Sequence, residues 1–155
     1  MSNTHEYKFY MQECDKYGNI VPNAPLKSLE EDFGGLRYSK IEGIEAVGAA
    51  KNIYTENYSE ADGLRVYMPQ EVKHKETTVK LTLWFIGETR HEDLKNFNEY
   101  IGNGLHRYWD TARNKWFAFF VKDELKPAES KWHGSTPYLK MEYNLVNILG
   151  KAFNV

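Results

Sequence analysis

The chain has 155 residues, the length of a single domain, and its 20 basic and 22 acidic residues leave a net charge of −2. This near-neutral balance excludes a bulk electrostatic grip on duplex nucleic acid and gives no reason to expect an anionic membrane partner. Aromatic residues make up 15 % of the chain, a proportion that favours sheets, packed cores and contact surfaces.

Three local features narrow the class of protein further. The longest apolar run, residues 116–121, is far shorter than the roughly 20 residues that span a bilayer. Residues 1–10 are polar and contain no apolar core of a signal peptide, so we expect no secretory signal. The single cysteine, Cys14, cannot form an internal disulfide or a cysteine-based zinc site. It is expected to be a small, buried or half-buried strand residue of a cytosolic chain.

Residues 1–76 form the loop-rich half of one predicted domain that covers residues 1–155. An aromatic run over residues 6–14 predicts a strand, and residues 15–19 supply turn chemistry. A second strand is predicted over residues 36–44. Residues 51–58 and 64–68 flank a polar stretch that contains Asp62 and Gly63, which predicts a β-hairpin with its turn at this pair.

Residues 77–153 form the half with the clearer pattern. Residues 77–86 alternate between apolar and polar side chains, which predicts a half-buried strand. Thr89 and Glu92 then match a capping box that starts a helix over residues 90–101. Three apolar residues share one face of this helix: Leu94, Phe97 and Ile101. Gly102 or Gly104 is expected to end the helix in a left-handed cap.

The last part of the chain predicts three more strands. Residues 105–109 and 115–121 surround a polar loop, and residues 122–136 are interpreted as a charged connection. Residues 138–149 alternate again and predict a long final strand. The order of elements predicts an α+β fold, a mostly antiparallel β-sandwich or split barrel with one flanking α-helix at about residues 90–101.

The residue patterns of catalytic and metal sites are missing from the sequence. The five histidines are scattered without metal-ligand spacing and are expected to be solvated surface residues. No nucleophile elbow, phosphate loop or dinucleotide-binding glycine motif occurs. Acidic residues are plentiful, but a glycosidase needs two carboxylates at a defined separation, which a sequence does not establish. We therefore expect no catalytic residue, no metal site and no cofactor, so that the protein is not an enzyme.

The four tryptophans fall in or beside predicted strands of the second half, and their role has several readings. They can pack the sheet, stack against sugar rings, or anchor a subunit interface, where tryptophan and tyrosine concentrate binding energy. A platform for single-stranded nucleic acid would also need a basic groove, which the net charge of −2 and the five arginines disfavour.

The second half resembles the tail-tube and distal-tail group of structural proteins from long-tailed bacteriophages and prophages. The resemblance covers residues 77–153 and rests on element order and aromatic placement. Five segments carry it: residues 81–86, 97–101, 108–111, 131–134 and 137–145. Proteins of this group have a β-sandwich or split barrel beside one helix, carry no catalytic residues and assemble into rings, commonly hexameric.

The resemblance implies a non-enzymatic building block of a phage or prophage tail, present in the host cytoplasm during assembly and then in the virion tail. Its partners would be further copies of the chain in a ring, with a hexamer as one candidate, and other tail proteins. No specific nucleic acid and no membrane are expected as partners. The alternative class is a carbohydrate-binding β-sandwich module with exposed tryptophan and tyrosine side chains, and a small hydrolase or nuclease ranks third.

Residues 45–75 form the candidate arm for self-association. Most connections in compact domains are only about 4–6 residues long, yet this longer one carries apolar and aromatic residues that a solvated loop does not need. A two-stranded hairpin is marginal alone in water, so it should gain stability against a neighbouring subunit. Folding back onto its own domain is the alternative. The candidate interface residues are Ile53, Tyr54, Tyr58, Val66 and Tyr67.

Overall fold

The computed structural model describes residues 8–51, 54–56, 65–67 and 73–154. Most of its secondary structure is antiparallel β-sheet, and helices are few, which confirms the predicted α+β fold class. The elements in chain order are β1 (Phe9–Glu13), β2 (Lys27–Ser28), α1 (Leu29–Asp32), β3 (Leu36–Glu42), β4 (Tyr54–Glu56), β5 (Arg65–Tyr67), β6 (Thr77–Ile86), α2 (Arg90–Ile101), β7 (His106–Asp110), β8 (Lys115–Val121), β9 (Glu129–His133), β10 (Thr136–Asn147) and β11 (Phe153–Asn154).

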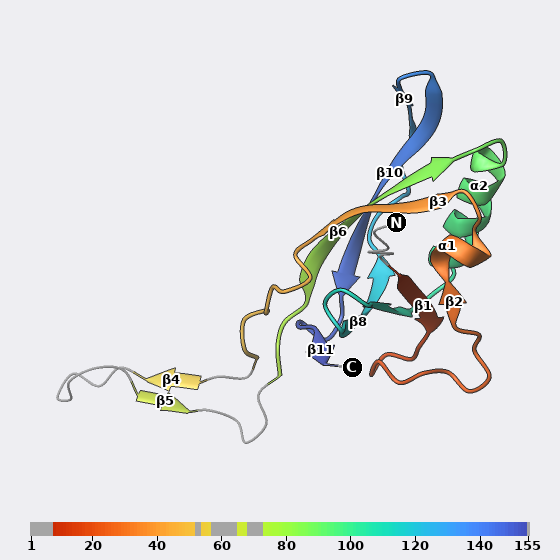
Figure 1. The fold of residues 1–155 in the computed structure, drawn as a ribbon. Coiled ribbons are helices and arrows are strands. Elements are labelled where there is room, and N and C mark those ends of the chain that lie inside the picture. Colours follow the sequence, from red (N-terminus) through yellow and green to blue (C-terminus); the bar gives the residue numbers. More distant parts are fainter. Residues whose placement is uncertain (1–7, 52–53, 57–64, 68–72, 155) are drawn as a thin grey trace.

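One nine-stranded sheet forms the body of the molecule. Its main path runs β2-β1-β7-β8-β10-β6-β3, with β9 paired to β10 and β11 paired to β8 (Figure 1). The sheet curls so strongly that its two edges approach each other. Phe9 of β1 and Tyr38 of β3 come from opposite ends of the strand order, yet their ring centroids lie 5.6 Å apart. The fold is therefore an open barrel.

The alternating strands turn their apolar side chains to the inside of this barrel. In β6 the four alternate apolar residues are fully buried: Val79, Leu81, Leu83 and Phe85. In β10 the matching residues are Leu139, Met141, Tyr143 and Leu145. These two strands pair over their whole common length, from Tyr138 opposite Ile86 to Asn147 opposite Thr77. The period-2 pattern in the sequence is thus explained, because each strand turns one face to the buried core and the other face toward solvent.

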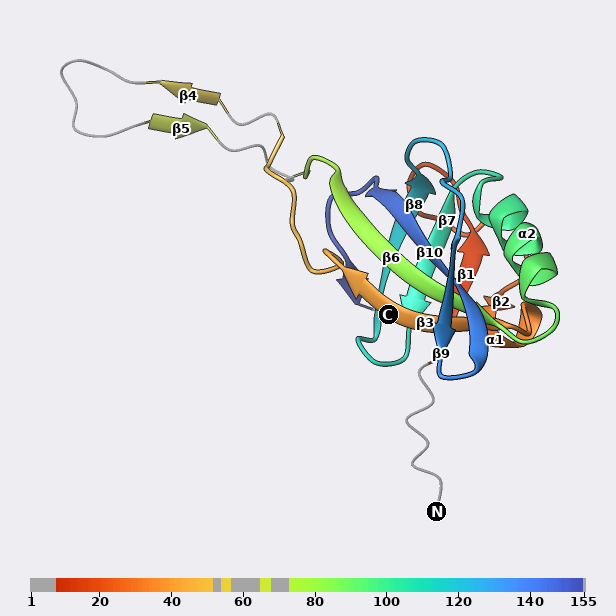
Figure 2. The same ribbon diagram turned by 90° about the horizontal axis from the view of Figure 1, so that it is seen from above.

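The predicted helix is confirmed as α2, which packs beside the curled sheet (Figure 2). Phe97 and Ile101 are fully buried, and Leu94 is partly buried against the same core. The ring of Phe97 lies 5.4 Å from that of Tyr143 and 5.3 Å from that of Phe33. In addition, the Tyr143 hydroxyl donates a hydrogen bond of 2.6 Å to Asn98 Oδ1, so α2 is fixed by apolar and polar contacts together.

The predicted capping box is wrong, although α2 does begin after Thr89. The Thr89 side chain makes no capping hydrogen bond to the helix backbone. Its hydroxyl instead donates to Asp93 Oδ2 at 2.9 Å, and the same oxygen accepts the Gly35 amide at 2.8 Å. Asp93 therefore links the start of α2 to the turn before β3. Asp93, four residues after Thr89, is the preferred partner of the Thr89 hydroxyl, because its carboxylate also satisfies a backbone amide that is far away in sequence.

Replacing Asp93 by alanine should lower the free energy of unfolding by about 1.5–3 kcal/mol, because two donors lose a charged acceptor. The Glu92→Ala control removes the residue on which the capping box depends and should change stability by less than about 0.5 kcal/mol, since Glu92 is exposed. Urea denaturation of both variants measures the difference. A larger loss for Glu92→Ala than for Asp93→Ala would restore the capping box.

Other details of the sequence prediction also need correction. The C-cap residue Gly102 is right-handed, with φ −80°, and Gly104 has φ 139°, so neither forms the left-handed cap. The connection predicted over residues 122–136 contains strand β9, which pairs with the first residues of β10. The short helix α1 was also not predicted. All five residues of β9 are exposed, so this strand lacks the apolar alternation from which strands are predicted.

Candidate functional site

The predicted hairpin is present as β4 and β5, which pair only with each other within the described chain. Tyr54 stands opposite Tyr67, and Thr55 stands opposite Val66. Both strands lie well away from the nine-stranded sheet (Figures 1 and 2). Of the candidate interface residues, Tyr54, Val66 and Tyr67 therefore belong to this projecting pair. Ile53 and Tyr58 lie outside the described residues, as does the predicted turn at Asp62 and Gly63.

The base of the hairpin is held by paired backbone. Lys51 donates its amide to the Lys73 carbonyl and Lys75 donates to the Ala49 carbonyl, both at 2.8 Å. Ala50 and His74 form an antiparallel bridge between these bonds. His74 Nδ1 also lies 3.0 Å from the Gly48 carbonyl oxygen. The two segments that lead to β4 and β5 are thus joined by backbone hydrogen bonds where they leave the barrel.

Two glycines anchor this base to the C-terminal end of β10. The Gly48 amide donates to the Gly150 carbonyl at 2.8 Å. A Cβ atom on either glycine would overlap the Lys75 carbonyl oxygen, and Gly150 has φ 73°, which disfavours a side chain further. The three segments therefore approach backbone to backbone. Because such close packing leaves little room for rotation, the base of the hairpin is held firmly against the barrel.

An aromatic groove lies on the outer face of the sheet over β1, β7 and β8. It has a volume of about 170 Å³. Its floor consists of outward-facing residues of neighbouring strands, Tyr10, Gln12, Arg107, Trp109 and Trp116, and its rim includes Ile20 and Leu26. The rim side chains are 46 % and 52 % exposed, respectively, which is high for aliphatic residues. Sequence reasoning missed this groove, because it arises from pairing between strands far apart in the chain.

The rings of this groove are stacked on one another. Tyr10 and Trp109, which are opposite each other in the β1–β7 ladder, stack with centroids 4.7 Å apart. Trp116 is covered on both sides of its indole: Phe153 stacks at 4.8 Å, and the Arg107 guanidinium lies 3.7 Å from the ring centroid. Burial lowers the pKa of Arg107. No described carboxylate forms an ion pair with this guanidinium, which makes a cation–π contact with the tryptophan ring.

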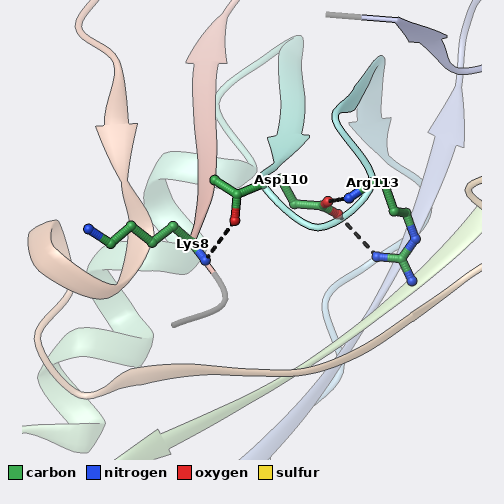
Figure 3. Close-up of polar contacts among 4 residues, drawn as sticks. Lys8, Asp110 and Arg113 are labelled. Atoms are coloured by element: carbon green, nitrogen blue, oxygen red, sulfur yellow. Dashed lines mark hydrogen bonds and ion pairs between the residues drawn. The ribbon is translucent and has the colours of Figure 1, made fainter. Parts of the chain in front are cut away.

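The buried charged cluster at the β7–β8 turn has a structural role. Asp110 is completely buried, and its Oδ1 accepts the Arg113 backbone amide at 2.7 Å while its Oδ2 contacts Arg113 Nη1 at 3.1 Å (Figure 3). Across the β1–β7 edge, the Thr111 amide donates to the Lys8 carbonyl at 2.9 Å. The carboxylate is thus engaged in holding the turn, where Asn114 adopts φ 52°.

The histidine expectation holds only in part. His91 and His133 are exposed, but His106 is buried between the Tyr100 ring at 4.6 Å and the Phe119 ring at 6.0 Å. Burial lowers the pKa of His106, with a smaller opposing effect from Glu13. The reason for the error is that His106 occupies an inward position of β7, between buried Phe119 of β8 and the barrel core.

The protein should lose stability as the pH falls below about 6.5, the ordinary pKa of histidine. The folded state keeps His106 neutral, so the unfolded state binds the proton more readily and is favoured in acid. Urea denaturation at pH 7.5 and 5.5 measures this loss. The His106→Phe variant should flatten the dependence and the exposed His91→Gln control should not; equal pH dependence in parent and His106→Phe would contradict the assignment.

Cys14 is buried as predicted, and burial raises the pKa of its thiol to about 11, so it stays protonated at neutral pH. Among the described residues, no group of three histidine, cysteine, aspartate or glutamate side chains is placed to hold a metal ion. Neither described helix has the length and apolarity needed to cross a bilayer.

Comparisons with known proteins add no relative. No protein-family model matches the chain, and no curated protein matches it.

Proposed function

We propose that the protein is a non-enzymatic structural protein of a phage or prophage tail, or of a tail-like particle, and that it assembles with copies of itself into a ring or tube. The observation that carries the proposal is the β4–β5 hairpin, which forms its own two-stranded sheet away from the barrel. This role places the protein in the host cytoplasm during assembly and then in the virion tail.

The low stability expected for an isolated hairpin supports a role in subunit contact. A two-stranded sheet in water is marginal, because most of its backbone and side chains stay solvated. Its base, however, is fixed by the hydrogen bonds among Gly48, Lys75 and Gly150 and their neighbours. A marginal element on a fixed base is well suited to contact a second subunit, which would cover the free strand edges of β4 and β5.

The barrel offers further edges for the other tail proteins expected as partners. Strand β9 pairs with β10 on one side only within the described chain, and all its residues are exposed. Trp132 of this strand is 69 % exposed. Glu129 and Lys131, which form an ion pair of 3.4 Å, keep the strand polar. Charged side chains on an edge strand oppose indiscriminate pairing, so a contact here would be selective.

The aromatic arrangement supports assembly more than the alternative of carbohydrate binding. A sugar ring needs an open aromatic face, but both faces of Trp116 are covered by Phe153 and Arg107. One face of Trp109 is covered by Tyr10. Trp84 lies against Tyr138 with centroids 4.8 Å apart. The open ring of Trp132 stands on the edge strand rather than in a cleft, as far as the described residues show.

Replacing residues 52–67 by a short Gly-Ser linker should convert an assembling protein into a folded monomer. The parent is expected to form a ring or higher oligomer at high concentration, and light scattering measures both masses. The variant should still fold, because the buried core belongs to the nine-stranded sheet and its helices. A parent that stays monomeric at millimolar concentration, or a variant that assembles like the parent, would refute the proposed role of the hairpin.

A further inference from the structure

The charge of Arg107 indicates which kind of group the aromatic groove can bind. The groove is lined by aromatic and aliphatic side chains, and no acidic residue is among them. Arg107 is half-buried and contributes the one positive charge of the lining. A desolvated guanidinium without a carboxylate partner favours an anionic group of a ligand, because Coulomb attraction is stronger where water is excluded. The groove is therefore suited to an aromatic or aliphatic segment that also carries a negative charge.

The hairpin segment of this same chain has that chemistry. Within the candidate arm of residues 45–75, we narrow the arm to residues 54–67, from the first residue of β4 to the last residue of β5. Its sequence contains three acidic residues, Glu56, Glu60 and Asp62, and one basic residue, Arg65. It also contains three tyrosines, Tyr54, Tyr58 and Tyr67. An acidic, tyrosine-rich arm complements an aromatic groove with a single cation, since tyrosine supplies large contact area with a polar end.

The two described strands of the arm lie apart from the groove of the same copy, because β4 and β5 lie well away from the curled sheet (Figures 1 and 2). The base is held against the barrel by the close approach of Gly48 and Gly150 to Lys75. Groove and base are also linked: Gly18, in the turn beside the groove, packs against Trp116 and against Leu149, which precedes Gly150. The groove therefore faces the arm of another subunit, in a contact between two different surfaces of the same chain.

We infer that the aromatic groove binds the arm of a second copy of this chain, and that Arg107 pairs there with a carboxylate of the arm, Glu60 or Asp62. This inference rests on the proposed self-assembly and adds the receiving surface to it. Contacts between two unlike surfaces of identical subunits propagate from copy to copy. If repeated rotation from copy to copy returns to the first copy, the subunits form a ring. If it does not, they form a helical tube.

The decisive experiment reverses the charges on both sides. The Arg107→Glu variant should weaken assembly at least about tenfold, because a buried attraction becomes a repulsion. The triple variant Arg107→Glu/Glu60→Arg/Asp62→Arg should regain assembly, since the charges are again complementary. Arg90→Glu is the control, as this arginine lies on α2 away from the groove. Analytical ultracentrifugation over a range of concentrations gives the association constants, and urea denaturation shows whether each variant is folded.

The outcomes separate this inference from the proposed function. If the linker variant is monomeric but Arg107→Glu assembles like the parent, the hairpin mediates assembly elsewhere and the inference is overturned. If neither the parent nor any variant associates, the proposed function fails first and the inference with it. Loss of assembly in Arg107→Glu together with recovery in the triple variant supports both, because an unfolded or merely destabilised chain would not be rescued by changes in the arm.

A cross-linking experiment tests the same contact should Arg107→Glu fail to fold. Protein with Leu26→Cys on the groove rim is mixed with protein with Tyr58→Cys in the arm, under mild oxidation. The inference expects a disulfide between the two chains. Cys14 need not be removed, because it is buried. The control mixes Tyr58→Cys with Ser130→Cys, at an exposed position of β9. Equal yields in the two mixtures would overturn the inference.

Discussion

The Phe97→Ala variant is expected to lose about 3–5 kcal/mol of unfolding free energy, the range for truncating a buried phenylalanine in a well-packed core. Phe97 is fully buried and is the point where three parts of the core meet. Its ring contacts Phe33 after α1, Phe85 of β6 and Tyr143 of β10, with centroid distances of 5.3, 6.1 and 5.4 Å. No single neighbour can fill the space, because each belongs to a different element.

Urea denaturation of parent and variant measures this effect. Lys95→Ala is the control, since Lys95 is exposed on the same helix and should change stability by less than about 0.5 kcal/mol. Alanine is a better helix former than phenylalanine, so a loss of stability in Phe97→Ala reports lost packing and not a lower helix propensity. A Phe97→Ala protein that unfolds at the same urea concentration as the parent would show that α2 does not cover the core.

The second large effect is expected at Gly35. A Cβ atom at this position would lie 2.6 Å from Asp93 Oδ2 and would overlap the Ile86 carbonyl oxygen. The residue joins three elements: its amide donates to Asp93 at 2.8 Å, and its carbonyl accepts the Ile86 amide at 2.7 Å. Gly35→Ala should therefore cost about 1–3 kcal/mol through overpacking, with about 1 kcal/mol more for each hydrogen bond that the shift breaks.

The neighbouring glycine provides a matched control. A Cβ atom at Gly34 would meet nothing within 4 Å, and its φ lies outside the left-handed range. Gly34→Ala should thus be neutral, or stabilising by up to about 1 kcal/mol, because alanine reduces the freedom of the unfolded chain. Thermal and urea denaturation of the two variants give the comparison. Equal losses at both positions would mean that the close approach at Gly35 is not a constraint on the fold.

Both predictions concern the region where sequence reasoning was partly right and partly wrong. The 3–4 spacing of apolar residues predicted α2 and its buried face, because an amphipathic helix carries its periodicity in the local sequence. The capping box was a local pattern as well, but the hydroxyl of Thr89 binds Asp93 instead. Asp93 accepts a second hydrogen bond from the Gly35 amide, which belongs to another element. The contact of Asp93 with the distant Gly35 amide leaves no trace in the residues around Thr89.

The difference between local patterns and tertiary contacts also explains which strands the sequence predicts. The alternation in β6 and β10 predicted both strands. Each strand has one buried and one more exposed face, so apolar side chains occur at every second residue. Strand β9 has no buried residue and is a strand only because β10 offers its edge. The burial of His106 likewise follows from its inward place on β7, one residue away from outward-facing Arg107. A one-residue difference in register decides which of the two faces the barrel core.

The sequence by itself determined the α+β class, the helix over residues 90–101, the main alternating strands and the existence of a hairpin between β3 and β6. These features depend on periodicity and turn chemistry within a few consecutive residues. Only the tertiary structure decided the order of the strands, the attachment of the hairpin base to the end of β10 and the groove around Arg107. These features depend on which distant segments approach each other. Tyr10 stacks on Trp109 and Gly48 is bonded to Gly150, and such pairings are set by the packing of the whole chain.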